Sequence, residues 1–230
     1  MEIAAAVALD SITREKVEAP FLDCGKKLKS NTMTREHLIN CIAAAEFSEW
    51  NNIFVYIVNT LKDARPEFAK AAAGIQAHKH HIENMIASLP EGRMYLETLR
   101  RLPPVWTERI LLVENHAGVM EFLNAVLSTE VAVETAMNGE EGLDKVRKTF
   151  FDVVISDVDL PVMNGIEFYK SASLHDPHIG DRFLFLTGSP TDETLAFFEQ
   201  RGARFLAKPI HINEFRETVS KLRDKRPIKT

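Results

Sequence analysis

Five polar or charged side chains follow short apolar runs in the second half of the chain. Glu114 and Asn115 come after the first of these runs, Asp157 ends a later one, Thr187 another, and Lys208 the last. Carboxylate and amide oxygens are the ligands that Mg²⁺ prefers. A hydroxyl and an ammonium group suit the oxygens of a phosphoryl group. This combination of side chains therefore predicts the transfer of a phosphoryl group to a carboxylate.

The apolar runs indicate strands that are buried on both faces of a sheet. We expect the strands over residues 110–113, 131–135, 153–155, 183–186 and 205–207. Helical patterns fill the gaps, at 139–150, 165–174, 191–201 and 212–223 and before residue 127. This alternation predicts a five-stranded parallel sheet with helices on both faces. Because the carboxyl ends of parallel strands meet at one edge, the five polar residues should project into one crevice.

These residues and their order resemble the receiver domains of bacterial response regulators, over roughly residues 107–226. By that resemblance Asp157, with Pro161 four residues later, is the phosphoacceptor. Thr187 takes the place of the switch hydroxyl, and Lys208, which precedes a proline, takes the place of the lysine beside the phosphoryl group. The resemblance implies a flavodoxin-like, doubly wound α/β fold. It also implies a cytoplasmic, bacterial two-component signalling protein that is not an enzyme.

The resemblance further implies a metal site, a switch and partner proteins. The ligands that it implies for Mg²⁺ are Glu114, Asn115, Asp157 and the backbone of Asp159. Thr187 and the aromatic Phe205 would move together when the acceptor is phosphorylated. A histidine kinase or phosphotransfer protein would supply the phosphoryl group, and an unknown protein would receive the output.

Asn115 departs from the family pattern, in which this position is normally a second acid. It keeps a carbonyl oxygen but lacks a negative charge. Losing a charge-assisted contact costs on the order of 1–3 kcal/mol, so we expect Mg²⁺ to bind roughly tenfold to a hundredfold more weakly. The alternative is a degenerate receiver that acts as a phosphorylation-independent scaffold. The presence of Asp157, Thr187 and Lys208 favours a working switch.

Residues 1–104 have few helix breakers, and their apolar spacing predicts an all-α domain. We expect helices over 34–64, 66–89 and 91–102, with partly helical structure before residue 30. The role of this domain as output, dimerisation or docking module is left open by the sequence, and so is homodimerisation.

Cysteines and histidines in this half offer weaker signals. Cys24 and Cys41 match no zinc or redox spacing, which predicts free thiols in a reducing cytosol. His80 should lie on the solvent face of its helix and is a candidate phosphohistidine, although no neighbouring motif supports that role. His78 and His81, three residues apart, are an incomplete metal-ligand pair.

Charge and hydropathy argue against two function classes. Residues 1–105 carry 13 basic and 13 acidic residues, and residues 106–230 carry 15 and 20, so no broad basic surface for nucleic acid is expected. DNA binding through the helical half stays a third alternative, without a helix-turn-helix signal. No stretch approaches 18 apolar residues, and the first ten residues lack a signal peptide's positive charge, so we expect no membrane association.

Overall fold

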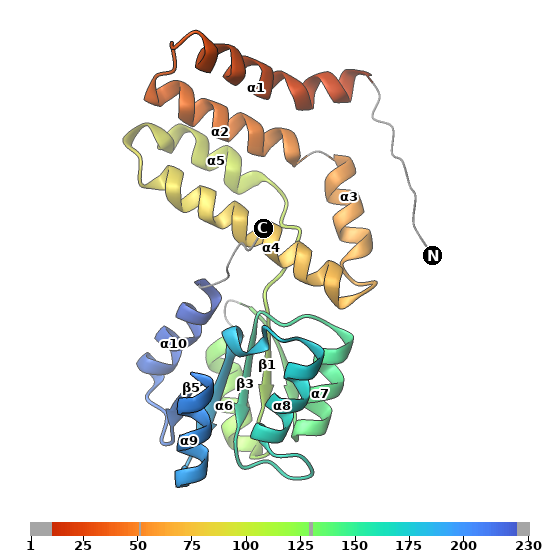
Figure 1. Cartoon of the computed structure of the whole chain (residues 1–230), viewed down its shortest axis with the longest axis vertical. Helices are drawn as coiled ribbons and strands as arrows, with labels where there is room; N and C mark the ends of the chain where they lie inside the picture. Colours follow the sequence, from red (N-terminus) through yellow and green to blue (C-terminus); the bar gives the residue numbers. More distant parts are fainter. Residues whose placement is uncertain (1–10, 51, 129–130, 225–230) are drawn as a thin grey trace. The chain divides into compact units, whose positions relative to one another are not determined.

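The residues that the computed structural model describes are 11–50, 52–128 and 131–224. The described residues divide into two compact units (Figure 1). One unit holds the residues up to 60 together with 76–105, and the other holds residues 61–75 together with those from 106 onward. The predicted domain boundary at residue 104 stays a prediction.

The first part of the chain is helical, as predicted. Its elements are α1 (Ser11–Lys29), α2 (Arg35–Glu49), α3 (Asn52–Leu61), α4 (Pro66–Ala87), the 3-10 turn η1 (Pro90–Gly92) and α5 (Arg93–Arg101). Pro66 is the first residue of α4, a position at which the backbone N–H has no partner within the helix, so the missing N–H of proline costs no hydrogen bond. Ala43, Ile82, Ile86 and Leu99 form the buried core that joins α2, α4 and α5. The predicted helices over 66–89 and 91–102 are therefore confirmed.

The single helix predicted over residues 34–64 is wrong, because α2 ends at Glu49 and α3 begins at Asn52. Asparagine favours helix ends, since its side chain competes with the helix for backbone hydrogen bonds. Trp50, just after α2, is buried, and its Nε1 donates a hydrogen bond to the carbonyl of Pro103 at 2.8 Å. The apolar periodicity continues from α2 into α3 and so does not predict the break. The burial of the Trp50 indole accounts for it.

The free thiols predicted for Cys24 and Cys41 are also wrong, because a disulfide joins the two residues. The helices α1 and α2 run side by side and place the two Cα atoms 5.8 Å apart, which lies in the normal range for a bridge. A separation of 17 residues does not reveal this proximity in the sequence. These cysteines therefore do not support the prediction of a reducing compartment.

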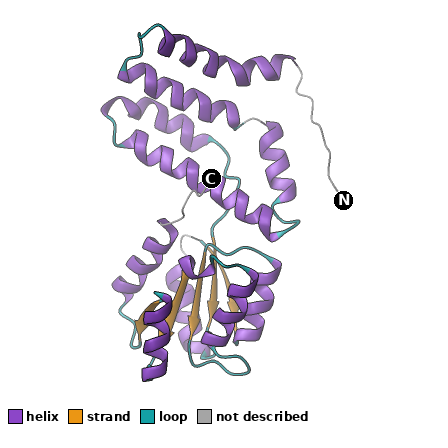
Figure 2. Cartoon of the chain, in the orientation of Figure 1, coloured by secondary structure: helices purple, strands orange, loops and turns teal. Residues whose placement is uncertain are grey.

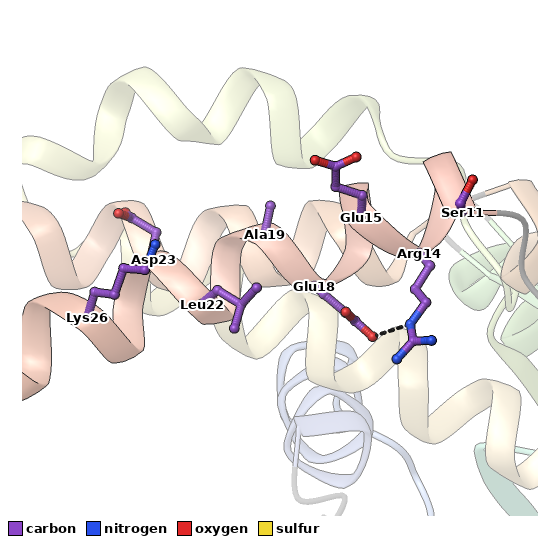
Figure 3. Close-up of a pocket in the computed structure, with 8 residues that line it drawn as sticks. All are labelled: Ser11, Arg14, Glu15, Glu18, Ala19, Leu22, Asp23 and Lys26. Atoms are coloured by element: carbon purple, nitrogen blue, oxygen red, sulfur yellow. Dashed lines mark hydrogen bonds and ion pairs between the residues drawn. The ribbon is translucent and has the colours of Figure 1, made fainter.

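One face of α1 lines a surface pocket (Figure 3). The lining residues described are Ser11, Arg14, Glu15, Glu18, Ala19, Leu22, Asp23 and Lys26. Across this face the Nε atom of Arg14 donates to Oε1 of Glu18 at 2.7 Å, and both side chains are well exposed. Charges of both signs in an i, i+4 arrangement are typical of a solvated helix face.

The second part of the chain holds a five-stranded parallel sheet, as predicted. Its strands are β1 (Arg109–Val113), β2 (Ala132–Ala136), β3 (Val153–Asp157), β4 (Phe183–Thr187) and β5 (Arg204–Ala207). Their order is β2-β1-β3-β4-β5, and every pair is parallel. In a doubly wound sheet of this order the connections change sides between β1 and β3, and a crevice opens at the carboxyl ends of those strands.

Helices cover both faces of the sheet (Figure 2). They are α6 (Ala117–Leu127), α7 (Gly139–Lys148), α8 (Gly165–His175), the 3-10 helix η2 (Ile179–Arg182), α9 (Asp192–Arg201) and α10 (Ile212–Asp224). Alternate residues of β1 face opposite cores: Leu111 packs with residues of α7, α8 and α9, whereas Leu112 packs with residues of α6 and α10. The central strands β1, β3 and β4 are therefore buried almost throughout, with only their ends open for chemistry, whereas the edge strands β2 and β5 are partly exposed.

Among the described residues, none of the helices combines the length and the apolar character needed to cross a membrane.

Candidate functional site

Four strands bring polar residues to the carboxyl edge of the sheet. Glu114 directly follows β1, Asp157 ends β3, Thr187 ends β4, and Lys208 directly follows β5. Glu114, Asp157 and Thr187 are buried, with 0%, 3% and 1% of their surface exposed. Glu114, Asp157 and Lys208 therefore meet at the carboxyl edge beside β1 and β3, and Thr187 ends the neighbouring strand β4.

Lys208 bonds both carboxylates of the crevice. Its Nζ atom lies 2.8 Å from Oε2 of Glu114 and 2.7 Å from Oδ2 of Asp157. The lysine side chain is 23% exposed, whereas the two acids are almost fully enclosed. Removing charged groups from water is costly unless each finds a partner, so one ammonium group offsets much of the cost of burying two carboxylates.

The two carboxyl groups respond oppositely to this environment. Burial raises the pKa of Asp157; the hydrogen bond from Lys208 does not outweigh it, and the pKa stays above its ordinary value. Burial also raises the pKa of Glu114, but the hydrogen bonds from Lys208 and from the backbone of His116 outweigh it, and the pKa falls below its ordinary value. The negative charge of this coupled pair is therefore held more firmly on Glu114.

Lys208 is itself held in the charged form. Burial lowers its pKa, but the hydrogen bonds to Asp157 and Glu114 outweigh burial and place the pKa above its ordinary value. The ammonium group is thus a permanent cation at the centre of the crevice.

The loop after β3 packs closely against Asp157. The hydroxyl of Ser156 donates to the Asp157 carbonyl at 2.8 Å, and the backbone N–H of Asp159 donates to Oδ1 of Asp157 at 3.4 Å. Gly165 opens α8 so close to this strand end that a Cβ atom there would lie 2.1 Å from the Asp157 carbonyl oxygen. Only glycine fits at that position, and its absence of a side chain fixes where the helix meets the end of β3.

Asn115 supplies a further oxygen near the strand end. Its Oδ1 atom is buried and has no hydrogen-bond partner within the described part of the chain. An unpaired buried oxygen is costly, and the carboxylates of Glu114 and Asp157, both bonded to Lys208, supply further oxygens at the same edge of the sheet. Such a set of oxygens fits a hard dication such as Mg²⁺, although Lys208 competes for the same carboxylates.

The comparisons with known proteins agree with this geometry. A family model for the response regulator receiver domain matches residues 110–220. Sporulation initiation phosphotransferase F of Bacillus subtilis (strain 168) is 34% identical over 116 residues, which are 50% of this chain and 92% of that protein. This chain belongs to the response regulator receiver family.

Other relatives of this receiver are longer than the matched region. Response regulator ArlR of Staphylococcus aureus (strain Mu50) is 26% identical over 122 residues, and the chain spans 55% of its length. A protein-glutamate methylesterase/protein-glutamine glutaminase of Bacillus licheniformis is 36% identical over 104 residues, which are 29% of that protein.

Among solved structures, the Vibrio cholerae chemotaxis protein CheY4 aligns over 50% of this chain and 98% of its own, with 30% identity and a TM-score of 0.46.

The receiver's β4 and β5 ends are tied together beneath the crevice. The backbone N–H of Lys208 donates to the carbonyl of Thr187 at 2.7 Å, and the Lys208–Pro209 peptide bond is cis. Phe205 is 39% exposed, and its ring stacks on Phe198 with centroids 4.8 Å apart. The switch roles of Thr187 and Phe205 stay predictions.

His116 is the site residue that sequence reasoning missed. Its backbone N–H donates to Oε1 of Glu114 at 3.0 Å, and its ring Nδ1 lies 3.3 Å from the same oxygen. Donor atoms of Glu114, His116 and Asp157 all lie within 4.8 Å of one another, a grouping suited to a metal ion. The signal in the sequence was a histidine two residues after a strand-end acid.

The histidines of α4 lie more than 30 residues before the crevice residues in the sequence. His80 is exposed, as predicted, and its Nε2 lies 3.3 Å from Nε2 of Gln76. His78 is half-buried and His81 is exposed. The phosphohistidine hypothesis for His80 stays a prediction.

Proposed function

We propose that this chain is a response regulator whose Asp157 accepts a phosphoryl group from a partner histidine kinase or phosphotransfer protein. The observation that supports this most is the buried Asp157 carboxylate at the end of β3, with its Oδ2 atom 2.7 Å from the Lys208 ammonium group. A buried acid with a raised pKa beside a fixed cation is typical of a functional site.

The transfer step needs few groups from the protein. A carboxylate oxygen of Asp157 attacks phosphorus, the O–P bond forms as the N–P bond of a donor phosphohistidine breaks, and the imidazole keeps the electron pair and takes a proton from solvent. Lys208 then exchanges one carboxylate contact for a phosphoryl oxygen, and the hydroxyl of Thr187 donates to another. Mg²⁺, when bound by Glu114, Asn115, Asp157 and the Asp159 backbone, neutralises charge on the phosphoryl group.

Phosphorylation changes the charge balance of a crowded crevice. The new dianion draws Thr187 inward. Phe205 then leaves its exposed position over Phe198 and fills the space that Thr187 vacates. A local charge change that biases a two-state element is the usual basis of such switches. The output acts on an unknown protein partner, through the receiver surface or through the helices α1 to α5, which also offer a dimerisation surface.

A second candidate is a receiver that works as a scaffold without phosphorylation. Two observations favour it: Asn115 lacks the charge expected at the metal site, and Lys208 already satisfies both carboxylates. In this case the receiver would dock its partner in one state only. Either way we place the protein in the cytoplasm, with protein partners and without nucleic acid, a membrane or an enzymatic activity of its own.

The test is phosphorylation of the full chain by phosphoramidate with Mg²⁺, followed by intact mass. We expect a gain of about 80 Da in the native protein, none in Asp157→Ala, and an unchanged gain in Asp181→Ala, a surface acid of η2 outside the crevice. Circular dichroism of each variant checks that it is folded. No gain with either Mg²⁺ or Mn²⁺, at any concentration, in folded native protein would exclude the switch and favour the scaffold.

A further inference from the structure

We infer that His116 is a metal ligand, so that this receiver binds a first-row transition-metal dication such as Mn²⁺ in preference to Mg²⁺. This inference deepens the proposed function, because it concerns the metal that serves the same crevice. It starts from the grouping of Glu114, His116 and Asp157, whose donor atoms lie within 4.8 Å of one another.

The distances suit shared coordination. His116 Nδ1 lies 3.3 Å from Oε1 of Glu114, and two ligand atoms about 2.1 Å from one ion lie about 3.0 to 3.4 Å apart at tetrahedral or octahedral angles. Opposite ligands of such an ion lie about 4.2 Å apart, so donor atoms that all lie within 4.8 Å of one another are close to the spacing that one ion requires. Glu114, with no exposed surface, is the fixed member of the set.

Helix capping does not explain the position of the imidazole. His116 is the residue before α6 and the N-cap of that helix, yet its side chain makes no capping hydrogen bond. Serine, aspartate and asparagine are the residues that cap helices well. The ring instead turns toward the carboxylate of Glu114, although 71% of the side chain is exposed and water is available.

The composition of the site changes which ion it prefers. Asn115 removes a negative charge that a hard ion such as Mg²⁺ depends on, while its buried Oδ1, unpaired within the described residues, still offers a neutral oxygen. An imidazole nitrogen strengthens binding of Mn²⁺, Co²⁺ or Zn²⁺ far more than binding of Mg²⁺. An ion on Nδ1 leaves the ring proton on Nε2, and because 71% of the side chain is exposed, solvent accepts its hydrogen bond there.

The test uses Mn²⁺ alone as the probe, with the full chain. Pulsed electron paramagnetic resonance detects a nitrogen nucleus bound to Mn²⁺, and the signal of free Mn²⁺ gives the affinity. The variants are His116→Ala and, as a matched control, His178→Ala, an exposed histidine beside the Asp181 carboxylate with no place in the crevice. Circular dichroism confirms that each variant is folded.

We expect the nitrogen coupling in the native protein and in His178→Ala and its loss in His116→Ala. The Mn²⁺ affinity of His116→Ala should fall about tenfold or more, whereas competition should show Mg²⁺ affinity changing less than about threefold. Coupling that persists in His116→Ala, equal Mn²⁺ affinity in both proteins, or no Mn²⁺ binding by the native protein would each overturn the inference.

The metal-site inference and the proposed phosphorylation switch can each fail without the other. If His116→Ala keeps its nitrogen coupling while Mg²⁺ still supports phosphorylation of Asp157, the inference fails and the switch stands. If the coupling is lost as expected but no ion supports phosphorylation, the metal site stands and the switch fails.

Discussion

Replacing Lys208 by methionine removes the cation that bonds both buried carboxylates of the crevice. Methionine keeps much of the apolar stem of the side chain, so the change is mainly one of charge. Breaking a buried ion pair by removing one partner costs about 3–5 kcal/mol. Because the Lys208 side chain is 23% exposed, water will replace part of the lost contact, and we expect the receiver to lose about 2–3 kcal/mol of unfolding free energy at pH 7.

The same loss should depend on pH with a definite sign. In the native protein the pKa of Glu114 is lowered, so its contribution to stability is present above its unfolded pKa and is lost as the pH falls. The pKa of Asp157 is raised, so its contribution is present below its unfolded pKa and is lost as the pH rises through its folded pKa. Without Lys208 both folded pKa values move upward, the carboxyl groups protonate more readily, and the mutant should approach native stability as the pH falls toward about 5.

The assay is urea unfolding followed by tryptophan fluorescence. Trp106 donates to Asp152 at 2.8 Å and is buried in the same unit as the crevice, so it reports on the receiver. A Trp50→Phe background removes the indole of the other unit. The control is Lys221→Met, whose exposed pair with Glu217 should leave stability nearly unchanged. A Lys208→Met protein as stable as the parent at pH 7, or a deficit that stays constant down to pH 5, would refute the electrostatic reasoning.

Three further predictions concern packing, the disulfide and the metal. Gly165→Ala places a Cβ atom 2.1 Å from the carbonyl oxygen of Asp157 and should cost about 1–3 kcal/mol in urea unfolding, whereas Gly188→Ala, with open space around it, should cost much less. Reduction of the Cys24–Cys41 bridge, which spans 17 residues, should destabilise the helical unit by about 3 kcal/mol; finding two alkylatable thiols in unreduced folded protein would contradict the bridge itself. Asn115→Asp should tighten Mg²⁺ binding roughly tenfold to a hundredfold, measured by calorimetry, and equal affinities would show that the missing charge is not what limits binding.

The strand ends were predictable because parallel strands leave few choices. A run such as residues 110–113 is too apolar to be anything but buried, and the first polar residue after it must therefore stand at the sheet's edge. Glu114, Asp157 and Lys208 belong to three different strands, yet their meeting follows from the strand order alone. The sequence thus predicted the crevice without any knowledge of the loops.

The features that were missed depend on loop paths and on helix pairing. Whether the ring of His116 turns toward Glu114 or toward solvent depends on backbone angles after β1, which no apolar pattern encodes. Cys24 and Cys41 meet only because α1 folds back along α2. The break before α3 depends on the long-range hydrogen bond from Trp50, which local periodicity does not register. For the cysteines and for Trp50 the deciding contact joins residues far apart in the sequence, whereas for His116 it depends on a loop conformation that residue spacing does not encode.

The asparagine at position 115 makes sense once the charges of the crevice are considered together. Two buried carboxylates already share one ammonium group, so an aspartate at 115 would add a third negative charge beside them and strengthen the repulsion that helps to raise the pKa of Asp157. Asparagine avoids that repulsion but weakens the attraction for a hard dication. A neutral imidazole from His116 recovers affinity without adding charge. The same substitution that argues for a degenerate receiver is therefore also what a receiver with a different metal preference requires, and the nitrogen coupling to His116 distinguishes the two.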